Sequence, residues 1–323
     1  MCGANNICMC PSHAVEYATY GCFAWGDLKK TRCFVLWGSA PSKSNVILLY
    51  PAIQERKRAG MKMIVVDPRR TAEAEMADIW LQIRPGTDLA LMLGWIRSII
   101  QEGLFDRDFV EKWTIGFDRL RDAASEYTPE KVAAITWLEP DKVIESARFY
   151  AQNKPAVISW GFGIDKQGLN ASQSARARSI LRAITGNLDV EGGELLGWSD
   201  PVGAIINFVV MELNEALSKE QRSKQLGAAE YPFFGFPGWE MNLQANKRLP
   251  SHYMHPPRAN MTSVAHERAV MEAILTGKPY PVTAMISLAS NPLLSLPNTR
   301  QIFEALKSLG LYVVSDYYLT PSA

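Results

Sequence analysis

The sequence lacks the features that would place it in several specialised classes. Its 323 residues include no run of about 18 uncharged apolar residues, roughly the length that a membrane-spanning helix needs. The net charge is +1 and no basic cluster is interleaved with aromatic residues, which excludes the usual electrostatic footprint of a nucleic-acid-binding protein. The first residues have neither a basic region nor an apolar core, so they do not resemble a signal peptide.

Cysteine is absent after residue 33, and all five cysteines lie up to that point. A secreted fold stapled by disulfides is shorter and spreads its cysteines, so this class is excluded. No pair has the C-x-x-C spacing of a zinc ribbon or redox motif. In the stretch NNICMCPSHA, Cys8 and Cys10 are too close in sequence to bond without strain, which leaves metal ligands or small buried residues. Cys2, Cys22 and Cys33 are expected to be small apolar residues.

Strands alternate with helices along the chain, a pattern typical of an α/β fold with parallel sheets and flanking helices. Apolar runs predict strands at 33–38, 62–66, 79–83, 156–163 and 282–292, and from residue 311 onward. Helices are predicted at 45–59, 89–101, 172–187 and 299–309, with further helical pieces within 106–151 and near 205–218.

Two other segments are expected to be loops. Residues 190–197 are rich in glycine, and residues 231–239 combine aromatic residues with proline and glycine. Because the length of the chain suggests about two domains, we expect one α/β domain at 1–200 and part of a second at 201–323.

Two predicted strand–helix–strand units end in an aspartate, and ligands of parallel sheets bind at the carboxyl ends of strands. Asp67 follows the apolar run 62–66, and Asp316 follows 311–315. Asp67 therefore either holds the hydroxyl groups of a ribose or caps the turn that follows it. Two nucleotide sites, one two-headed ligand or chance would explain the repeated arrangement. The fingerprint G-x-G-x-x-G is absent, so a plain nicotinamide site is not expected.

Ten segments occur in a recognisable order along almost the whole chain. They are ICMCPSHA, VLWGSAPSKSN, IVVDPRRT, ADIWLQIRPGTDLAL, GLFDRDFVEKWTIGF, YTPEKVAAIT, ISWGFGIDKQ, RAITGNLDVEGG, ASNPL and VVSDYYLTPSA. In this order they resemble the catalytic subunits of the dimethyl sulfoxide reductase superfamily, molybdenum or tungsten enzymes that carry two molybdopterin guanine dinucleotides. AEMADIWLQIRPGTDLALMLG, SARARSILRAITGN and KQLGAAEYPFFGF favour the acetylene hydratase branch. The resemblance implies α/β lobes that bind dinucleotides.

The resemblance also answers the question raised by the first cysteines. In the superfamily, a side chain on the loop before the first strand ligates the metal, and Cys8 matches that position. A thiolate is a soft ligand, which suits a metal already held by dithiolene sulfurs. Cys10 is the alternative ligand. Met9 stands where formate dehydrogenases of the superfamily have a histidine, so an apolar pocket for a small nonpolar substrate is expected.

The resemblance further implies which residues contact the cofactor. One nucleotide would be held by Asp67 and Arg69, with Gly86 and Asp88 continuing the site, and the other by Asn291 and Asp316. Backbone approach to the pterins and phosphates would occur at Gly38, Ser39, Gly161 and Gly163. An aspartate suits guanine, because it accepts from both the N1–H and the N2 amino group. The superfamily commonly has asparagine where this chain has Ala40, so one contact is lost or moves to Ser39.

Three functions follow from the resemblance. A hydratase would use the metal to polarise water or a small unsaturated substrate without net redox change. An oxidoreductase on the same scaffold would transfer an oxo group or two electrons, with an electron-transfer subunit as partner. The third is a non-catalytic cofactor-binding chain. We expect this chain to be the central part of a longer cytoplasmic enzyme, whose four-iron four-sulfur cluster, catalytic acid and final barrel domain lie outside it.

Overall fold

The computed structural model describes residues 10–165, 170–196, 216–248 and 264–323. Contacts group the chain into two compact units. The first unit is Ile7–Phe208 with Met241–Pro257, and the second is Met1–Asn6 with Val209–Glu240 and Arg258–Ala323. The domain division expected at residue 200 remains a prediction, because the grouping of contacts does not test whether a segment folds alone.

The first unit is built on a four-stranded parallel sheet with the order β4-β3-β2-β5. Its strands are β2 (Cys33–Trp37), β3 (Lys62–Val66), β4 (Ile79–Leu81) and β5 (Ala156–Trp160). Cys33 pairs with Lys62 of β3 and with Ala156 of β5. All residues of β2 are buried, as is usual for a parallel strand that is covered on both faces. The predicted α/β fold is therefore confirmed.

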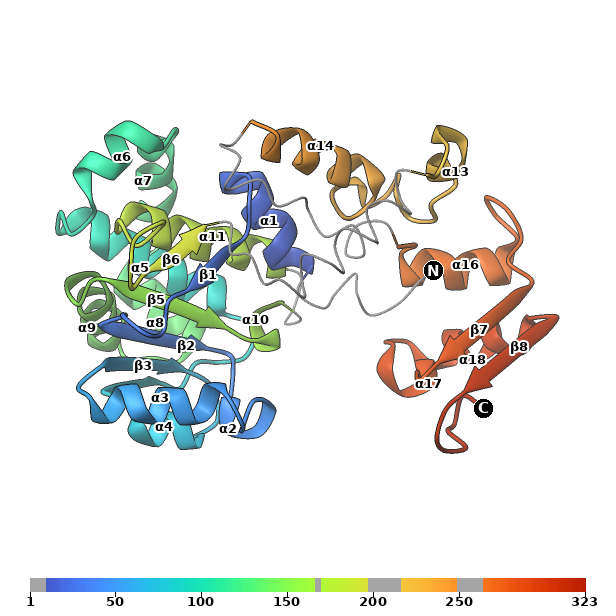
Figure 1. Ribbon diagram of the computed structural model, residues 1–323, viewed down its shortest axis with the longest axis horizontal. Helices are drawn as coiled ribbons and strands as arrows, with labels where there is room; N and C mark the ends of the chain where they lie inside the picture. Colours follow the sequence, from blue (N-terminus) through green and yellow to red (C-terminus); the bar gives the residue numbers. More distant parts are fainter. Residues whose placement is uncertain (1–9, 166–169, 197–215, 249–263) are drawn as a thin grey trace. The chain divides into compact units, whose positions relative to one another are not determined.

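Successive residues of β2 point to opposite faces of the sheet and join two different cores. The helices that cover the first face are α5 (Asp88–Gln101), α9 (Pro140–Gln152) and α11 (Ala171–Ile184), and those on the second are α3 (Leu49–Arg58) and α4 (Ala72–Met76) (Figure 1). Val35 and Trp37 belong to the first core, whereas Phe34 and Leu36 belong to the second. The sheet is thus a rigid platform whose strand ends can carry a site.

The remaining elements of the first unit surround this platform. They are α1 (Cys10–Tyr20), α2 (Pro41–Ser44), α6 (Arg107–Trp113), α7 (Phe117–Ser125), α8 (Pro129–Thr136) and α10 (Phe162–Asp165), with β1 (Ala24–Gly26) paired antiparallel to β6 (Glu194–Leu196). The helical pieces predicted within 106–151 are confirmed as α6 to α9. The structure adds α1 and the β1–β6 pair, which the sequence did not indicate.

Some predicted boundaries are wrong. The helix expected at 45–59 begins only at Leu49, whose backbone N–H donates to Asn45 Oδ1 at 3.1 Å. The expected loop at 190–197 contains β6, which forms because Leu196 pairs with Ala24 far away in the sequence. The expected loop at 231–239 holds a 3-10 turn (Pro232–Phe234) and the start of α14 (Phe236–Asn246).

The helix expected near 205–218 lies mostly outside the described residues. Residues 216–218 are not helical, and α13 (Lys219–Ser223) begins after them. The Ser218 hydroxyl accepts from the Gln221 N–H at 3.2 Å, while Gln221 Oε1 accepts from the Ser218 N–H at 2.8 Å, a reciprocal cap that fixes the start of α13.

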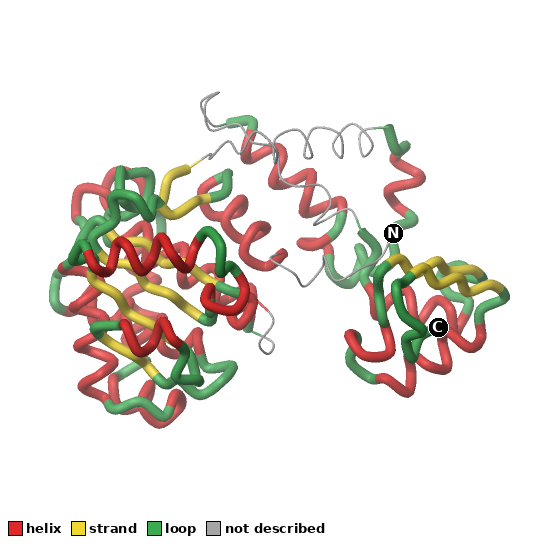
Figure 2. Tube along the Cα trace, turned by 60° about the horizontal axis from the view of Figure 1, so that its bottom comes forward, coloured by secondary structure: helices red, strands yellow, loops and turns green. Residues whose placement is uncertain are grey.

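The second unit contains the second predicted strand–helix–strand motif. The strands β7 (Ala284–Leu288) and β8 (Leu311–Ser315) pair in parallel, and α17 (Pro292–Ser295) and α18 (Thr299–Ser308) connect them. Figure 2 shows helices against one face of this strand pair. Met271 of α16 (Glu267–Thr276) packs there with Ile302 and Leu306 of α18. Throughout the described part of the chain, no helix is long and apolar enough to cross a membrane.

Candidate cofactor site

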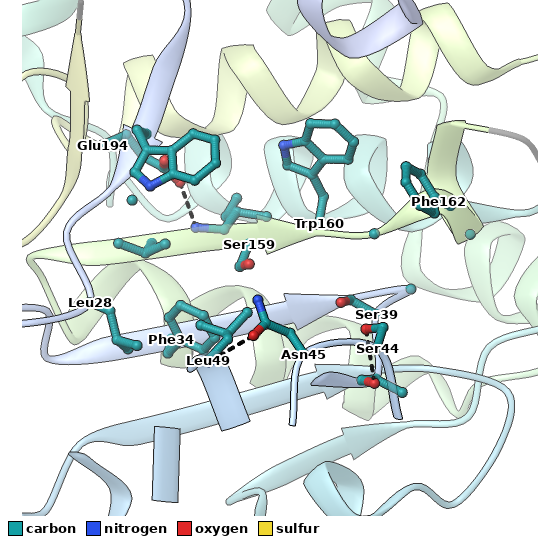
Figure 3. Close-up of a pocket in the computed structure, with 18 of the residues that line it drawn as sticks. Leu28, Phe34, Ser39, Ser44, Asn45, Leu49, Ser159, Trp160, Phe162 and Glu194 are labelled. Carbon is teal, nitrogen blue, oxygen red and sulfur yellow. Dashed lines mark hydrogen bonds between the residues drawn. The ribbon is translucent and has the colours of Figure 1, made fainter. Parts of the chain in front are cut away.

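A cavity of about 560 Å³ lies along β5, the edge strand of the sheet in the first unit. This volume falls within the range of roughly 300–1,000 Å³ that small-ligand sites occupy. In Figure 3, Ser159 and Trp160 leave β5 in opposite directions, with Phe34 on the side of Ser159 and Glu194 on the side of Trp160. The lining residues include Phe23, Trp25, Leu28, Phe34, Leu49, Trp160 and Phe162, and the polar residues Ser39, Lys43, Ser44, Asn45, Arg69, Ser159, Arg182 and Glu194. The cavity therefore suits a ligand with planar rings and anionic groups.

Four of the predicted cofactor residues meet at one end of this cavity, where β2 and β5 end. Gly38, Ser39, Gly161 and Gly163 all belong to its lining. The Gly161 N–H donates to the Trp37 carbonyl at 2.9 Å, and the Gly163 N–H donates to the Gly38 carbonyl at 3.3 Å. A Cβ atom on Gly161 would lie 2.3 Å from the Gly38 carbonyl oxygen. Gly161 is thus required by the contact between the two loops, and its approach to a cofactor remains a prediction.

Asp67 and Arg69 lie in the turn that follows β3, and they behave differently. Asp67 is 4% exposed, and its Oδ1 accepts from the Arg69 N–H at 2.8 Å. The geometry is that of the turn-capping alternative, and the Asp67 side chain does not line the cavity. Burial raises the pKa of Asp67, although the Arg69 N–H and guanidinium oppose the shift. Arg69 is exposed and lines the cavity. The ribose and guanine roles of the pair remain predictions.

Gly86 and Asp88 do not line this cavity. Gly86 has a φ of +81°, and a Cβ atom there would meet open space, so the backbone conformation accounts for the glycine. Asp88 begins α5 and accepts from Trp37 Nε1–H at 2.7 Å. Burial raises the pKa of Asp88, whereas the Trp37 hydrogen bond opposes this shift. Asp88 thereby fixes the last residue of β2, immediately before the loop that lines the cavity.

Asn291 and Asp316 lie in the second unit, each just past the carboxyl end of a strand. The strand ends adjoin, because the Ala289 N–H donates to the Ser315 carbonyl at 2.8 Å. Asn291 stands at the start of α17, and its Oδ1 accepts from the Ser322 hydroxyl at 2.6 Å. Asp316 is exposed and accepts from the Tyr317 N–H. The two side chains lie beyond the carboxyl ends of β7 and β8, which are at the same end of the sheet because the strands are parallel. Their role in binding guanine remains a prediction.

The predicted metal ligand Cys8 and its neighbour Met9 lie outside the described residues, as does Cys2. Their roles are therefore carried forward as proposals. Within the described ranges, no group of three or more His, Cys, Asp or Glu side chains is placed to hold a metal ion. Cys33 is fully buried, and burial raises its pKa to about 12, so its thiol stays protonated at neutral pH. Cys22 is also fully buried, which agrees with the prediction that both are small apolar residues.

A buried ion cluster beside the cavity was missed by the sequence analysis. Glu16 Oε1 accepts from Arg178 at 2.8 Å and from Arg182 at 2.6 Å, and Arg182 Nε lies 2.9 Å from Glu194 Oε1. All four side chains are at most 2% exposed. Burial raises the pKa of Glu194, and Arg182 opposes this shift. One sequence feature could have indicated this cluster. Arg178 and Arg182 are four residues apart, on a helix face that otherwise carries mostly small residues.

The cluster connects the cavity wall to α1. Arg182 and Glu194 line the cavity, and the Arg178 guanidinium lies 4.4 Å from the ring centroid of Trp160, another lining residue. Two positive and two negative charges balance one another, as buried ionic groups require. Glu16 also binds the Ala24 N–H at 3.1 Å, so α1 is fastened to β1 as well as to α11.

Comparisons with known proteins agree with this fold. Acetylene hydratase of Syntrophotalea acetylenica is 36% identical over 99% of the chain, which covers 43% of that protein. The α subunit of an F420-dependent formate dehydrogenase from Methanocaldococcus jannaschii is 29% identical over 92% of the chain, which covers 40% of that protein. A nitrate reductase of Symbiobacterium thermophilum is 36% identical over 98% of the chain, which covers 42% of that protein. The chain thus spans about two-fifths of the length of these relatives.

A solved structure gives the same result. Acetylene hydratase from Pelobacter acetylenicus superposes with a TM-score of 0.87 at 36% sequence identity, covering 99% of this chain and 43% of that one. Residues 4–323 match the molybdopterin oxidoreductase family. The chain therefore belongs to the molybdopterin oxidoreductase family of enzymes, whose members use molybdopterin with molybdenum or tungsten, and it is similar to acetylene hydratase over nearly all its residues.

Proposed function

We propose that this chain is part of a molybdenum or tungsten enzyme of the acetylene hydratase type, which adds water to a small unsaturated substrate without net redox change. The observation that carries the proposal is the likeness to acetylene hydratase over 99% of the chain, in sequence at 36% identity and in structure at a TM-score of 0.87. Met9 supports it, because an apolar residue beside the metal ligand favours a nonpolar substrate over formate.

The cofactor proposed is a bis-molybdopterin guanine dinucleotide, and the first unit fits one of its halves. The cavity brings aromatic rings together with two cationic side chains, Lys43 and Arg69. The planar rings of the cofactor can stack on the aromatic side chains, and its phosphates can pair with Lys43 and Arg69. Asp67 directly follows β3 and does not line the cavity, but it fixes the turn that carries Arg69, and it would serve the nucleotide end at that turn. Asn291 and Asp316 would serve the second dinucleotide.

Cys8 would supply the protein ligand to the metal. When bound, the metal would act as a Lewis acid that polarises water or the multiple bond of the substrate. The described residues would contribute by other means. Asp88 fixes Trp37 and so the end of β2, the loop residues Gly38 and Ser39 bind through their backbone, and the ion cluster holds the wall formed by Trp160. The catalytic acid and a four-iron four-sulfur cluster are proposed for parts of the enzyme outside this chain.

An oxidoreductase on the same scaffold is the second candidate, because the F420-dependent formate dehydrogenases and a nitrate reductase are also similar over most of the chain. In that case an electron-transfer subunit would be a partner. A cytoplasmic location is proposed for either function.

The test uses the complete enzyme purified with its native cofactor. Metal and pterin content are measured first, followed by turnover of acetylene with and without an artificial electron acceptor. Hydration that needs no acceptor supports the proposal. Turnover of any substrate that strictly requires an acceptor would establish the oxidoreductase instead. A purified protein that contains no metal would leave the non-catalytic alternative.

A further inference from the structure

Residues 38–45, which comprise the loop after β2, the short helix α2 and Asn45, line part of the cavity and are held from the interior side. Residues 38–40 and 43–45 line the cavity, whereas Pro41 and Ser42 do not. Pro41 is buried, and residues 43–48 are exposed. Residues 38–45 therefore have one surface toward the cavity and one toward the protein interior. Gly38 is held by the Val66 carbonyl, and Pro41 and Ser42 attach the middle of the segment.

Glu73 of α4 makes that attachment. Its side chain is fully buried, and both of its carboxylate oxygens bind the same residue. The Ser42 N–H donates to Oε1 at 2.5 Å, and the Ser42 hydroxyl donates to Oε2 at 3.1 Å. The residue that precedes α2, Ala40, has no side chain that could accept from the first turn. Glu73 thus supplies from another element the acceptor that a capping side chain would provide.

Glu73 is also fixed to the turn that carries Arg69, a second segment of the cavity lining. Glu73 lies in the first turn of α4, which starts where Thr71 Oγ1 accepts from the Ala74 N–H at 3.2 Å. The turn just before it carries Arg69, which lines the cavity and whose N–H is held by Asp67. One buried carboxylate therefore connects residues 38–45, which include Ser39 and Lys43, to the turn that contains Arg69.

We propose that Glu73 is a positioning residue of the cofactor cavity, which holds residues 38–45 in their ligand-binding conformation from the side opposite the ligand. The inference rests on the proposed function, because it assumes that the cavity binds the guanine nucleotide end of the cofactor. Glu73 touches no ligand. It acts through Ser42, so that the ligand does not have to order the loop when it binds.

The test uses titration calorimetry to compare the binding of GDP to the full chain with its binding to variants of the chain. Glu73→Ala is expected to weaken GDP binding about tenfold, because the loop loses its anchor and must be ordered by the ligand. Glu73→Gln keeps the Oε1 acceptor for the Ser42 N–H and is expected to bind within about twofold of the unsubstituted chain. The matched control is Glu75→Ala on the same helix, whose side chain is exposed and is expected to change nothing.

The outcomes separate the two proposals. If the unsubstituted chain does not bind GDP, the nucleotide site in the cavity is wrong, and the positioning role falls with it. If the chain binds GDP and Glu73→Ala binds equally well, only the positioning role is wrong. Equal loss in Glu73→Gln and Glu73→Ala would also overturn it, because charge rather than the hydrogen bond to Ser42 would then matter. If Glu73→Ala does not fold, Glu73→Asp decides, because the shorter side chain keeps the charge but cannot reach both the Ser42 N–H and the Ser42 hydroxyl: weaker GDP binding supports the proposal, and unchanged binding overturns it.

Discussion

At the scale of single residues, a buried carboxylate can oppose the stability of the fold around it. Asp67 is buried except for 4% of its surface, and burial raises its pKa above that of a free aspartate. In the folded state the protonated form is therefore favoured. The contribution of Asp67 to stability is complete below the carboxyl pKa of the unfolded chain, and it is lost as the pH rises through the higher folded pKa.

Asp67→Asn is therefore expected to stabilise the chain at neutral pH. The amide keeps an oxygen that can accept from the Arg69 N–H, while no charge has to be buried. Urea unfolding at pH 7 should give a higher midpoint for the variant, and the difference should disappear near pH 3, where Asp67 itself is protonated. A variant that is less stable than the parent at pH 7 would show that the carboxylate has a structural role. Weaker GDP binding by the same variant would support its nucleotide role.

A second prediction at this scale concerns the metal ligand. In the complete enzyme, Cys8→Ala should abolish turnover and lower the metal content while the pterin is retained, because a thiolate ligand is lost and the dinucleotide contacts are not. Activity, metal by mass spectrometry and pterin by fluorescence after oxidation check this. Cys10→Ala is the matched control and should remain active. The assignment is wrong if Cys10→Ala is inactive and Cys8→Ala is not.

At the scale of elements, the buried ion cluster connects helices that the sequence keeps far apart. Glu16→Gln would leave the buried Arg178 and Arg182 with one balancing charge, that of Glu194. Removing one member of a buried ion pair typically destabilises a protein by about 3–5 kcal/mol, and a loss of this size is expected in chemical denaturation. Glu191→Gln is the control, because Glu191 pairs with Lys30 on the surface and its loss should matter little. Equal effects of the two substitutions would contradict the importance of burial.

The same elements show what local sequence can predict. Apolar runs such as CFVLW and KMIVV predicted β2 and β3, because a strand buried on both faces has a continuous apolar composition. The helix α1 was missed, since its position depends on arginines more than 160 residues away that neutralise Glu16. The strand β6 was missed for a similar reason, because three residues form a strand only if β1 is present to pair with them.

The candidate site shows the same difference between residues that the sequence can indicate and residues whose role depends on distant parts of the chain. Gly38, Ser39 and Arg69 were predicted from the resemblance to the superfamily, and the structure brings them to one cavity. Glu73 and Arg182 were not. Glu73 belongs to an ordinary helical pattern of charges, and the i, i+4 spacing of Arg178 and Arg182 does not show which carboxylates lie opposite. Their importance depends on which loop or carboxylate lies opposite in the folded chain, and no local pattern carries that information.

At the scale of the whole molecule, the two units repeat one arrangement. Each has parallel strands whose carboxyl ends carry an acidic side chain, Asp67 in the first unit and Asp316 in the second. A cofactor with two guanine dinucleotides would need two such sites, and a single nucleotide would need one. The units differ in burial, because Asp67 is almost fully enclosed while Asp316 is exposed. An exposed carboxylate can meet a ligand without first breaking contacts with its own unit.

Asp316→Ala should therefore reduce the guanine dinucleotide retained by the complete enzyme without unfolding the second unit. The carboxylate would be lost as acceptor for the guanine N1–H and amino group, whereas the hydrogen bond between Asn291 and Ser322 would remain. Nucleotide released by acid and counted per polypeptide measures the effect, and thermal unfolding checks the fold. Glu304→Ala, on the exposed face of α18, removes a carboxylate of the same unit and should leave the nucleotide content unchanged. Equal nucleotide content in both variants would show that Asp316 does not bind guanine. The aspartate that follows a parallel strand in each unit would then have a structural role and not a ligand-binding one.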